Sequence, residues 1–197
     1  MSTETTRVAV IGGGAAGLTA ALFLARAGLQ VELYDQDRSI LKRARLLNLP
    51  GHDELEGREL LDQLRGKIDV LEVATHEGKV DDVSVEDGVF RVHSAQGGDA
   101  TVSYVVLATG QGTLRLASLP VATTEARQPF VKVNVVTDRW GATSLPGVYA
   151  CGVVAGWPSQ AVVCAGSGAN VAIEIASQVT GSFWVDHDDT RLAADPE

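Results

Sequence analysis

Three glycines and one aspartate near the start of the chain have the spacing of a nucleotide-binding turn. Gly12, Gly14 and Gly17 follow an apolar run that starts at Val8, and Asp35 ends a second apolar run 23 residues after Gly12. The first glycine allows a tight turn, the second lets backbone N–H groups approach a pyrophosphate, and the third lets a helix pack closely on a sheet. The Asp35 carboxylate is placed to accept hydrogen bonds from a ribose. The pattern predicts binding of a nucleotide diphosphate, with a packed turn that binds nothing as the alternative.

Two buried strands and a helix are needed to position these residues. The apolar runs 8–11 and 31–34 have the length and composition of parallel strands that are buried on both faces. Between them, apolar residues recur at helical spacing as far as Gly28, a residue suited to the position just after a helix end. A complete unit of strand, glycines, helix, strand and acid favours binding far more strongly than the glycines alone.

The patterns downstream predict an α/β fold, with a parallel central sheet and a small antiparallel β excursion. A helical pattern begins near Gly57 and ends near Gly66, and several β-rich runs follow it. Two of these runs join at Asp87-Gly88, a dipeptide suited to a type I′ hairpin turn, so we expect the antiparallel excursion over about 78–103. A last helix is expected over about 160–178.

The length of the chain predicts one domain. A chain of 197 residues with 45% apolar content can bury an ordinary single core. We expect this domain to cover residues 1–185. The acidic segment 186–197 is expected to be a disordered tail.

Composition argues against several classes of partner and site. The formal net charge of −9, with no long basic stripe, disfavours binding to nucleic acid. Cys151 and Cys164 are the two cysteines and do not form a CxxC pair, so neither a disulfide scaffold nor a metal site is predicted. The four histidines are scattered and suggest no hydrolytic constellation.

Neither a membrane anchor nor a secretion signal is predicted. The first apolar helix is explained by the nucleotide-binding unit, and the long uncharged stretch 140–173 is broken by Gly, Pro and Ser. The first residues, MSTETT, lack a basic start followed by an apolar stretch. We therefore expect a cytoplasmic protein that makes no contact with a membrane.

The sequence resembles the FAD domain of the thioredoxin-reductase-like flavoproteins over most of its length. Five segments match that family in the same order along the chain. They are GGGAAG at 12–17, NLPG at 48–51, VVLATG at 105–110, TSLPGVYACG at 143–152 and SQAVVCAGSGANVA at 159–172. The resemblance implies a Rossmann-like FAD-binding domain of an FAD-dependent oxidoreductase.

The resemblance also implies which residues bind FAD. The residues that contact the ADP half are Gly12, Gly14, Ala15, Ala16, Gly17 and Asp35. The residues implied at the turn where the chain leaves the domain are Thr109 and Gly110, and those at the ribityl and flavin end are Asn48, Gly152, Val153, Gln160 and Ala161. A helix that starts near Gln160 would favour negative charge at the flavin N1 and C2 oxygen and raise the reduction potential. Without the family pattern, the preferred interpretation of Gln160 is an ordinary surface residue at a helix start.

Three departures from the family pattern bear on function. The interval from Gln111 to about Pro129 is too short for a domain, so the NADPH domain and its redox CxxC are missing. Val153 stands where the family has an Asp that binds a ribityl hydroxyl. A hydrogen bond lost from a charged group costs about 1.5–3 kcal/mol, or roughly 10- to 150-fold in affinity. The segment before Asn48 reads ILKRARLL in place of a glycine-glutamine loop.

Three functional hypotheses follow. The favoured one is a single-domain FAD oxidoreductase that receives electrons from a separate redox partner or from a freely diffusing nicotinamide cofactor. The alternatives are a non-catalytic FAD carrier, sensor or subunit, and an NAD(P)-binding Rossmann protein. Catalytic residues and the small-molecule substrate are not identified by the sequence. A homodimer is expected, because a flavin edge without a partner domain exposes apolar surface.

Overall fold

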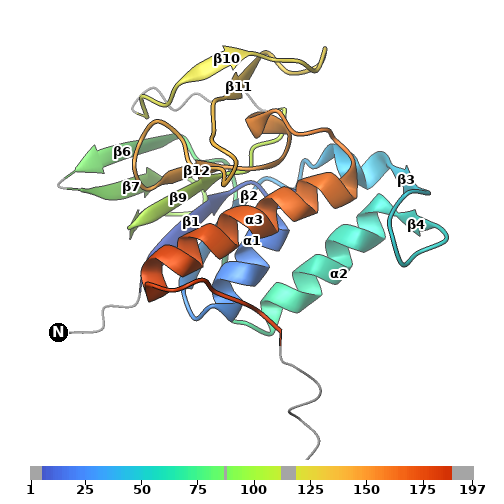
Figure 1. Cartoon of the computed structure of the whole chain (residues 1–197), viewed down its shortest axis with the longest axis horizontal. Coiled ribbons are helices and arrows are strands. Elements are labelled where there is room, and N and C mark those ends of the chain that lie inside the picture. Colours follow the sequence, from blue (N-terminus) through green and yellow to red (C-terminus); the bar gives the residue numbers. More distant parts are fainter. Residues whose placement is uncertain (1–5, 87, 112–118, 188–197) are drawn as a thin grey trace, which may run out of the picture.

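A parallel sheet of five strands forms the centre of the protein, shown here as a computed structural model that describes residues 6–86, 88–111 and 119–187. The strand order is β12-β9-β1-β2-β5, and all four neighbouring pairs are parallel (Figure 1). The strands are β1 (Arg7–Ile11), β2 (Gln30–Asp35), β5 (Ala74–Glu77), β9 (Tyr104–Leu107) and β12 (Val148–Ala150).

Helices cover one face of this sheet and a second sheet covers the other (Figure 1). The helices are α1 (Ala15–Arg26), α2 (Gly57–Asp69) and α3 (Ala161–Thr180). The second sheet is antiparallel and consists of β6 (Asp82–Glu86), β7 (Val89–His93) and β8 (Ala100–Val102). The remaining elements are short: η1 (Ile40–Arg43), β3 (Arg45–Leu46), β4 (Leu55–Glu56), β10 (Thr123–Glu125), β11 (Val133–Val135) and η2 (Gly152–Ala155). The predicted fold class, a Rossmann-like α/β domain with an antiparallel excursion, is confirmed.

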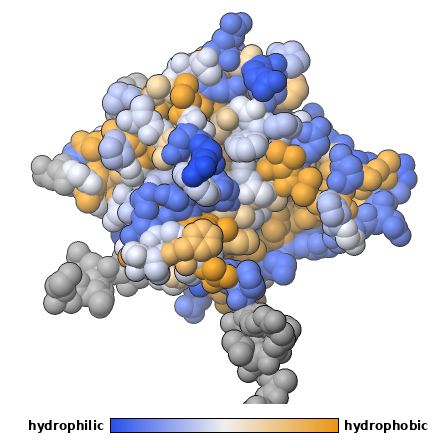
Figure 2. Space-filling model, in the orientation of Figure 1, coloured by the Kyte–Doolittle hydropathy of each residue, from blue (hydrophilic) through white to orange (hydrophobic). Residues whose placement is uncertain are grey.

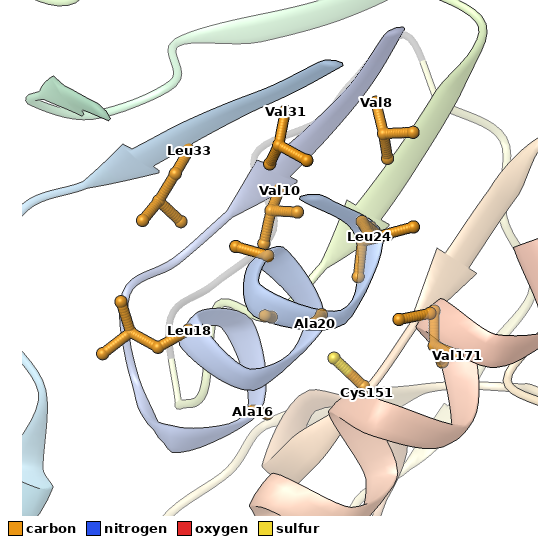
Figure 3. Packing of buried hydrophobic residues seen from close by; sticks show 14 of the residues in the cluster. Val8, Val10, Ala16, Leu18, Ala20, Leu24, Val31, Leu33, Cys151 and Val171 are labelled. Atoms are coloured by element: carbon orange, nitrogen blue, oxygen red, sulfur yellow. The ribbon is translucent and has the colours of Figure 1, made fainter. Parts of the chain in front are cut away.

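The apolar runs of β1 and β2 are buried on both faces, as the sequence predicted. Because side chains alternate along a strand, Val10 and Leu33 point to the helices, whereas Ile11 and Tyr34 pack with the second sheet. Figure 3 shows the helix side of this arrangement, where Val8, Val10 and Val31 of the strands lie near Leu24 of α1, and α3 lies beside α1. The central strands therefore contribute side chains to two hydrophobic cores, one on each face of the sheet.

Helix α3 is 20 residues long and apolar enough, by length and composition, to cross a membrane. Its buried side packs along α1, the most extensive contact between two elements of the fold. At Gly168 the two helices touch backbone to backbone, because a Cβ there would lie 2.0 Å from the Ala16 carbonyl oxygen. The apolar residues on this side of α3, among them Val171, Ala172 and Ile175, are part of the core.

Several local predictions differ from the structure. Helix α2 continues past Gly66 to Asp69, since Gly66 is exposed and tolerated within the helix. Strand β10 lies in a stretch for which no regular element was predicted. Gly28 does follow the end of α1 with a φ of +80°, as predicted. Asp87 of the predicted hairpin turn and residues 188–197 of the predicted tail lie outside the described residues.

Ion pairs around the buried carboxylate of Glu32 join β1, β2 and β5. The Glu32 carboxylate is paired with the Arg7 guanidinium, and its Oε2 lies 2.6 Å from Nε2 of His76. The ring of Tyr34 stacks on His76 with centroids 4.6 Å apart. Burial alone would raise the pKa of Glu32, but hydrogen bonds with His76 and Arg7 outweigh it and hold the pKa below its ordinary value of 4.5. Glu32 is therefore ionised in the folded protein at neutral pH.

Replacing Glu32 by Gln is expected to lower the free energy of unfolding at pH 7 by about 2 kcal/mol. Because the folded pKa lies below the unfolded one, the carboxylate stabilises the fold above about pH 4.5, and this stabilisation is lost as the pH falls through the folded pKa. Urea denaturation at pH 7 and at about pH 3.5 should show the gap between wild type and Glu32→Gln closing in acid. Glu125→Gln, on exposed β10, is the control. A gap that is constant with pH would contradict this assignment.

Candidate nucleotide-binding site

Four parallel strands end at one edge of the sheet, and most of the predicted site residues follow these ends. Ile11 is in register with both Tyr34 and Leu107, and Leu107 is in register with Ala150. The chain segments that leave this edge carry Gly12, Asp35, Thr109, Gly110 and Gly152. In open α/β sheets ligands bind at the carboxyl ends of the strands.

Gly12 and Gly17 are required by the chain itself. Gly12 has a φ of +117°, and a Cβ there would lie 2.3 Å from the Ala108 carbonyl oxygen. A Cβ on Gly17 would lie 1.8 Å from the Gly12 carbonyl oxygen. These two glycines let the turn, the start of α1 and the end of β9 meet in direct backbone contact.

Gly14 is different, because nothing in the chain requires a glycine there. Its φ of −84° and ψ of −176° are open to any residue, and an added Cβ would meet only the Ser39 Oγ, at 3.6 Å. Gly14 precedes the first turn of α1, in which no side chain caps the backbone N–H groups of residues such as Ala15 and Ala16. Free N–H groups at a helix start attract anions. Gly14 therefore leaves room for a side chain beside these N–H groups, and the sequence prediction assigns that room to a pyrophosphate.

The Asp35 carboxylate lies against the same turn. A Cβ on Gly13 would lie 2.1 Å from Asp35 Oδ2, so the carboxylate rests directly over the Gly13 backbone. Its Oδ1 accepts a hydrogen bond from the Asp37 N–H at 2.9 Å, and its Oδ2 accepts one from Arg65 Nη2 at 3.0 Å. The predicted ribose acid is thus beside the predicted pyrophosphate turn.

The turn after β9 offers one polar atom without a partner. Thr109 Oγ1 is buried and has no hydrogen-bond partner among the described residues. Gly110 follows with a φ of +65°, and a Cβ there would meet nothing within 4 Å. The Thr109 hydroxyl is thus closed to solvent, whereas Gly110 next to it borders open space.

The segment after β12 packs directly on the start of α1. A Cβ on Gly152 would lie 2.9 Å from the Ala16 Cβ, and the Gly152 N–H donates to Ser167 Oγ at 2.9 Å. Val153 is only 7% exposed and belongs to the core cluster between the sheet and the helices. Its carbonyl oxygen accepts a hydrogen bond of 2.9 Å from Nδ2 of buried Asn134. Gly152 and Val153, two of the predicted flavin-end residues, therefore pack against the start of α1, which follows the predicted pyrophosphate turn.

The other flavin-end residues gather at the amino end of α3. The helix begins at Ala161, and exposed Gln160 is its N-cap without a side-chain capping bond. Buried Ala161 packs with Leu46 and Leu55 of the β3–β4 hairpin, whose exposed loop carries Asn48. Asn48, Gln160 and Ala161 are thus at one end of the molecule, and not at the pyrophosphate turn.

Three residues of this site had not been singled out from the sequence: Gly13, Arg65 and Asn134. Gly13 had a usable signal, because it lies inside the glycine turn opposite the acid. Arg65 and Asn134 had none, since an arginine on an amphipathic helix and an asparagine in a β-rich run are ordinary residues. Their roles depend on contacts across 30 and 19 residues of sequence.

Comparisons with known proteins identify a matching family and similar folds. The profile of a family described as pyridine nucleotide-disulphide oxidoreductase matches residues 6–130. A thioredoxin reductase from Gloeobacter violaceus has a TM-score of 0.77 and 21% identity, over 94% of this chain and 100% of that one. An oxidoreductase from Agrobacterium tumefaciens has a TM-score of 0.77 and 18% identity, over 89% and 98%. An atypical thioredoxin reductase from Desulfovibrio vulgaris Hildenborough has a TM-score of 0.74 and 16% identity, over 90% and 99%. A search of curated protein sequences gave no match.

Substitution of Gly17, which the packing requires, and of Gly14, which it does not, should change the free energy of unfolding of the nucleotide-free protein by different amounts. Gly17→Ala forces a Cβ onto the Gly12 carbonyl and is expected to lower the free energy of unfolding by about 3 kcal/mol or more. Gly14→Ala meets open space at an ordinary φ and should change it by less than about 1 kcal/mol in either direction. Urea denaturation at pH 7 measures both. Equal destabilisation by the two variants would show that Gly14 is also a packing glycine.

Proposed function

Because the chain belongs to the pyridine nucleotide-disulphide oxidoreductase family, we propose that it binds FAD along the carboxyl edge of its parallel sheet and transfers electrons there. The fold is that of thioredoxin reductases, and the family uses flavin and nicotinamide nucleotides. The choice of FAD, the role as a single-domain electron carrier and the identity of the redox partner are the parts that we propose. The partner is a separate redox protein or a freely diffusing nicotinamide cofactor.

The observation that carries the choice of FAD is the relation between α1 and α3. The helices meet at Ala16 and Gly168, and both amino ends point to the carboxyl edge of the sheet. Helix α3 begins seven residues before Gly168, so it extends about 10 Å further than α1, at 1.5 Å per residue. The two helix starts therefore suit a long ligand with a diphosphate at one and a second acceptor group at the other.

The chain's own groups divide the work of holding such a ligand. The N–H groups after Gly14 bind the diphosphate, and the Asp35 carboxylate accepts hydrogen bonds from the adenosine ribose. The first N–H groups of α3, beyond Gln160, donate to the pyrimidine side of the ring system. When bound, the flavin would supply the ability to accept and donate a hydride.

A non-catalytic role as a flavin carrier or subunit has one observation in its favour. Val153 offers a methyl group and not a carboxylate where the ribityl chain would pass, and its side chain is buried in the core. On this alternative, the site binds the ADP half of the cofactor tightly and makes few contacts that would tune the reactivity of the flavin ring. Binding of NAD(P) alone leaves the amino end of α3 without a ligand group and is the least supported reading.

A homodimer and a cytoplasmic location also belong to this proposal. Apolar side chains are exposed beside the flavin end at Phe130, Val133 and Trp157, and Figure 2 shows hydrophobic surface between α2 and the amino-terminal half of α3. A second copy of the chain would cover such surface. Cys151 and Cys164 are both free and buried, which suits a reducing compartment.

We expect FAD to copurify with the protein or to bind on reconstitution. Gly14→Val should weaken FAD binding on the order of 100-fold, because its side chain occupies the space meant for the diphosphate. Isothermal titration calorimetry with FAD and with NADH measures both affinities. Gly166→Val, on the exposed side of α3 with open space around it, is the control and should bind FAD as the wild type does. Tight binding of NADH without binding of FAD would refute the proposal.

Val153→Asp tests the path of the ribityl chain. The carboxylate is expected to tighten FAD binding by about 10-fold or more by accepting a ribityl hydroxyl. The same substitution buries a charge in an apolar cluster, so the nucleotide-free variant should unfold at a lower urea concentration than the wild type. Added FAD should then raise the unfolding midpoint more in the variant than in the wild type. Unchanged or weaker FAD binding would mean that the ribityl chain does not pass residue 153.

A further inference from the structure

Arg65 of α2 contacts two carboxylates at the end of β2. Its Nη2 lies 3.0 Å from Asp35 Oδ2 and 2.9 Å from Asp37 Oδ1, and its Nη1 lies 3.4 Å from Asp62 Oδ1. The Arg65 side chain is 28% exposed and that of Asp35 is 13% exposed, so this ion pair is more shielded from solvent than a surface salt bridge. One guanidinium group therefore ties a helix to the loop that carries the predicted ribose acid.

The loop itself is held in an unusual conformation. Asp37 has a φ of +55°, a left-handed value that is uncommon for a residue other than glycine. Its carboxylate pairs with Lys42 as well as with Arg65, and the hydrogen bond from Lys42 lowers the pKa of Asp37. With two cations on it, Asp37 stays ionised and keeps the loop folded over the end of β2. The backbone N–H of Asp37 then points at Asp35 Oδ1.

The hydrogen bonds from Asp37 and Arg65 leave part of the Asp35 carboxylate available to a ligand. An ionised carboxylate has about four lone-pair sites, two on each oxygen. The Asp37 N–H takes one site on Oδ1 and Arg65 takes one on Oδ2. One site remains on each oxygen, beside Gly13 and the pyrophosphate turn. Two acceptors that are held side by side match the two neighbouring hydroxyls of a ribose.

We propose that Arg65 is a positioning residue, which holds the Asp35 carboxylate in the one orientation that accepts both ribose hydroxyls of an adenosine diphosphate group. This inference rests on the proposed function, since the group is the ADP half of the proposed cofactor. Without Arg65, Asp35 and Asp37 would repel each other and the Asp35 side chain could turn away from Gly13. A clamp that only stabilised α2 would not affect how the protein senses the hydroxyls of its ligand.

The test compares ADP with 2′,3′-dideoxy-ADP, which lacks both ribose hydroxyls. The ratio of the two affinities isolates the contacts of the ribose hydroxyls. Removing the positive charge of Arg65 should weaken the binding of both ligands equally, because both carry the same diphosphate. By isothermal titration calorimetry the wild type should favour ADP by about 10-fold or more. Arg65→Met should reduce this ratio to less than about 2-fold, as should Asp35→Asn, and the double variant should show no further loss. Lys67→Met, an equal charge change at an exposed position of α2, should keep the wild-type ratio.

The outcomes that overturn the inference are distinct from the failure of the proposed function. A wild-type ratio retained in Arg65→Met would overturn it, and Arg65→Gln is measured alongside so that a variant that folds is available. A wild type that binds FAD but favours neither ADP nor its dideoxy analogue would overturn the inference and leave the proposed function standing. A wild type that binds none of the three ligands would refute the proposed function, and the inference with it.

Discussion

Direct contact between backbones at the start of α1 is the constraint on which the rest of the structure depends. Gly17 lies on the carbonyl of Gly12, and Gly168 of α3 lies on the carbonyl of Ala16, each too close for any side chain. The first contact sets the distance from α1 to the sheet, and the second sets the distance from α3 to α1. Both helix starts are thereby brought to the same edge of the sheet. Side chains at these two glycines would separate the layers and remove the edge as a binding surface.

Two acids of β2, Glu32 and Asp35, lie in different surroundings. Glu32 faces the second sheet, where it is buried and paired with Arg7 and His76. Asp35 is the last residue of the strand and meets Arg65 at the edge. Each carboxylate is shielded from solvent and each has an arginine partner. The difference lies in the remaining acceptor sites, since both oxygens of Glu32 are occupied by protein groups within the fold, whereas Asp35 keeps its free sites beside an open turn.

The sequence was sufficient where structure follows from local pattern. The glycine turn, strands β1 and β2 and the start of α3 depend on residues within a few positions of one another, and these were predicted closely. The end of α2 was not, because Gly66 is a weak stop signal on a helix that packs well on both sides of it. Arg65 could not be predicted, since its meaning comes from an acid 30 residues away that only the fold brings within 3.0 Å. The burial of Val153 likewise depends on how η2 turns after β12.

The two ends of the candidate site therefore differ in how strongly the packing of the fold determines their residues. At the proposed pyrophosphate end, Gly12 and Gly17 are required by the packing itself, and the fold that they belong to is shared with a thioredoxin reductase of known structure at 21% identity. The proposed flavin end combines residues that the packing fixes, such as buried Val153 and Ala161, with the exposed residues Asn48 and Gln160. Val153 and the ILKRARLL segment lie in this second part. The fold tolerates change at the exposed positions of this part, whereas a side chain at Gly12 or Gly17 would collide with the backbone.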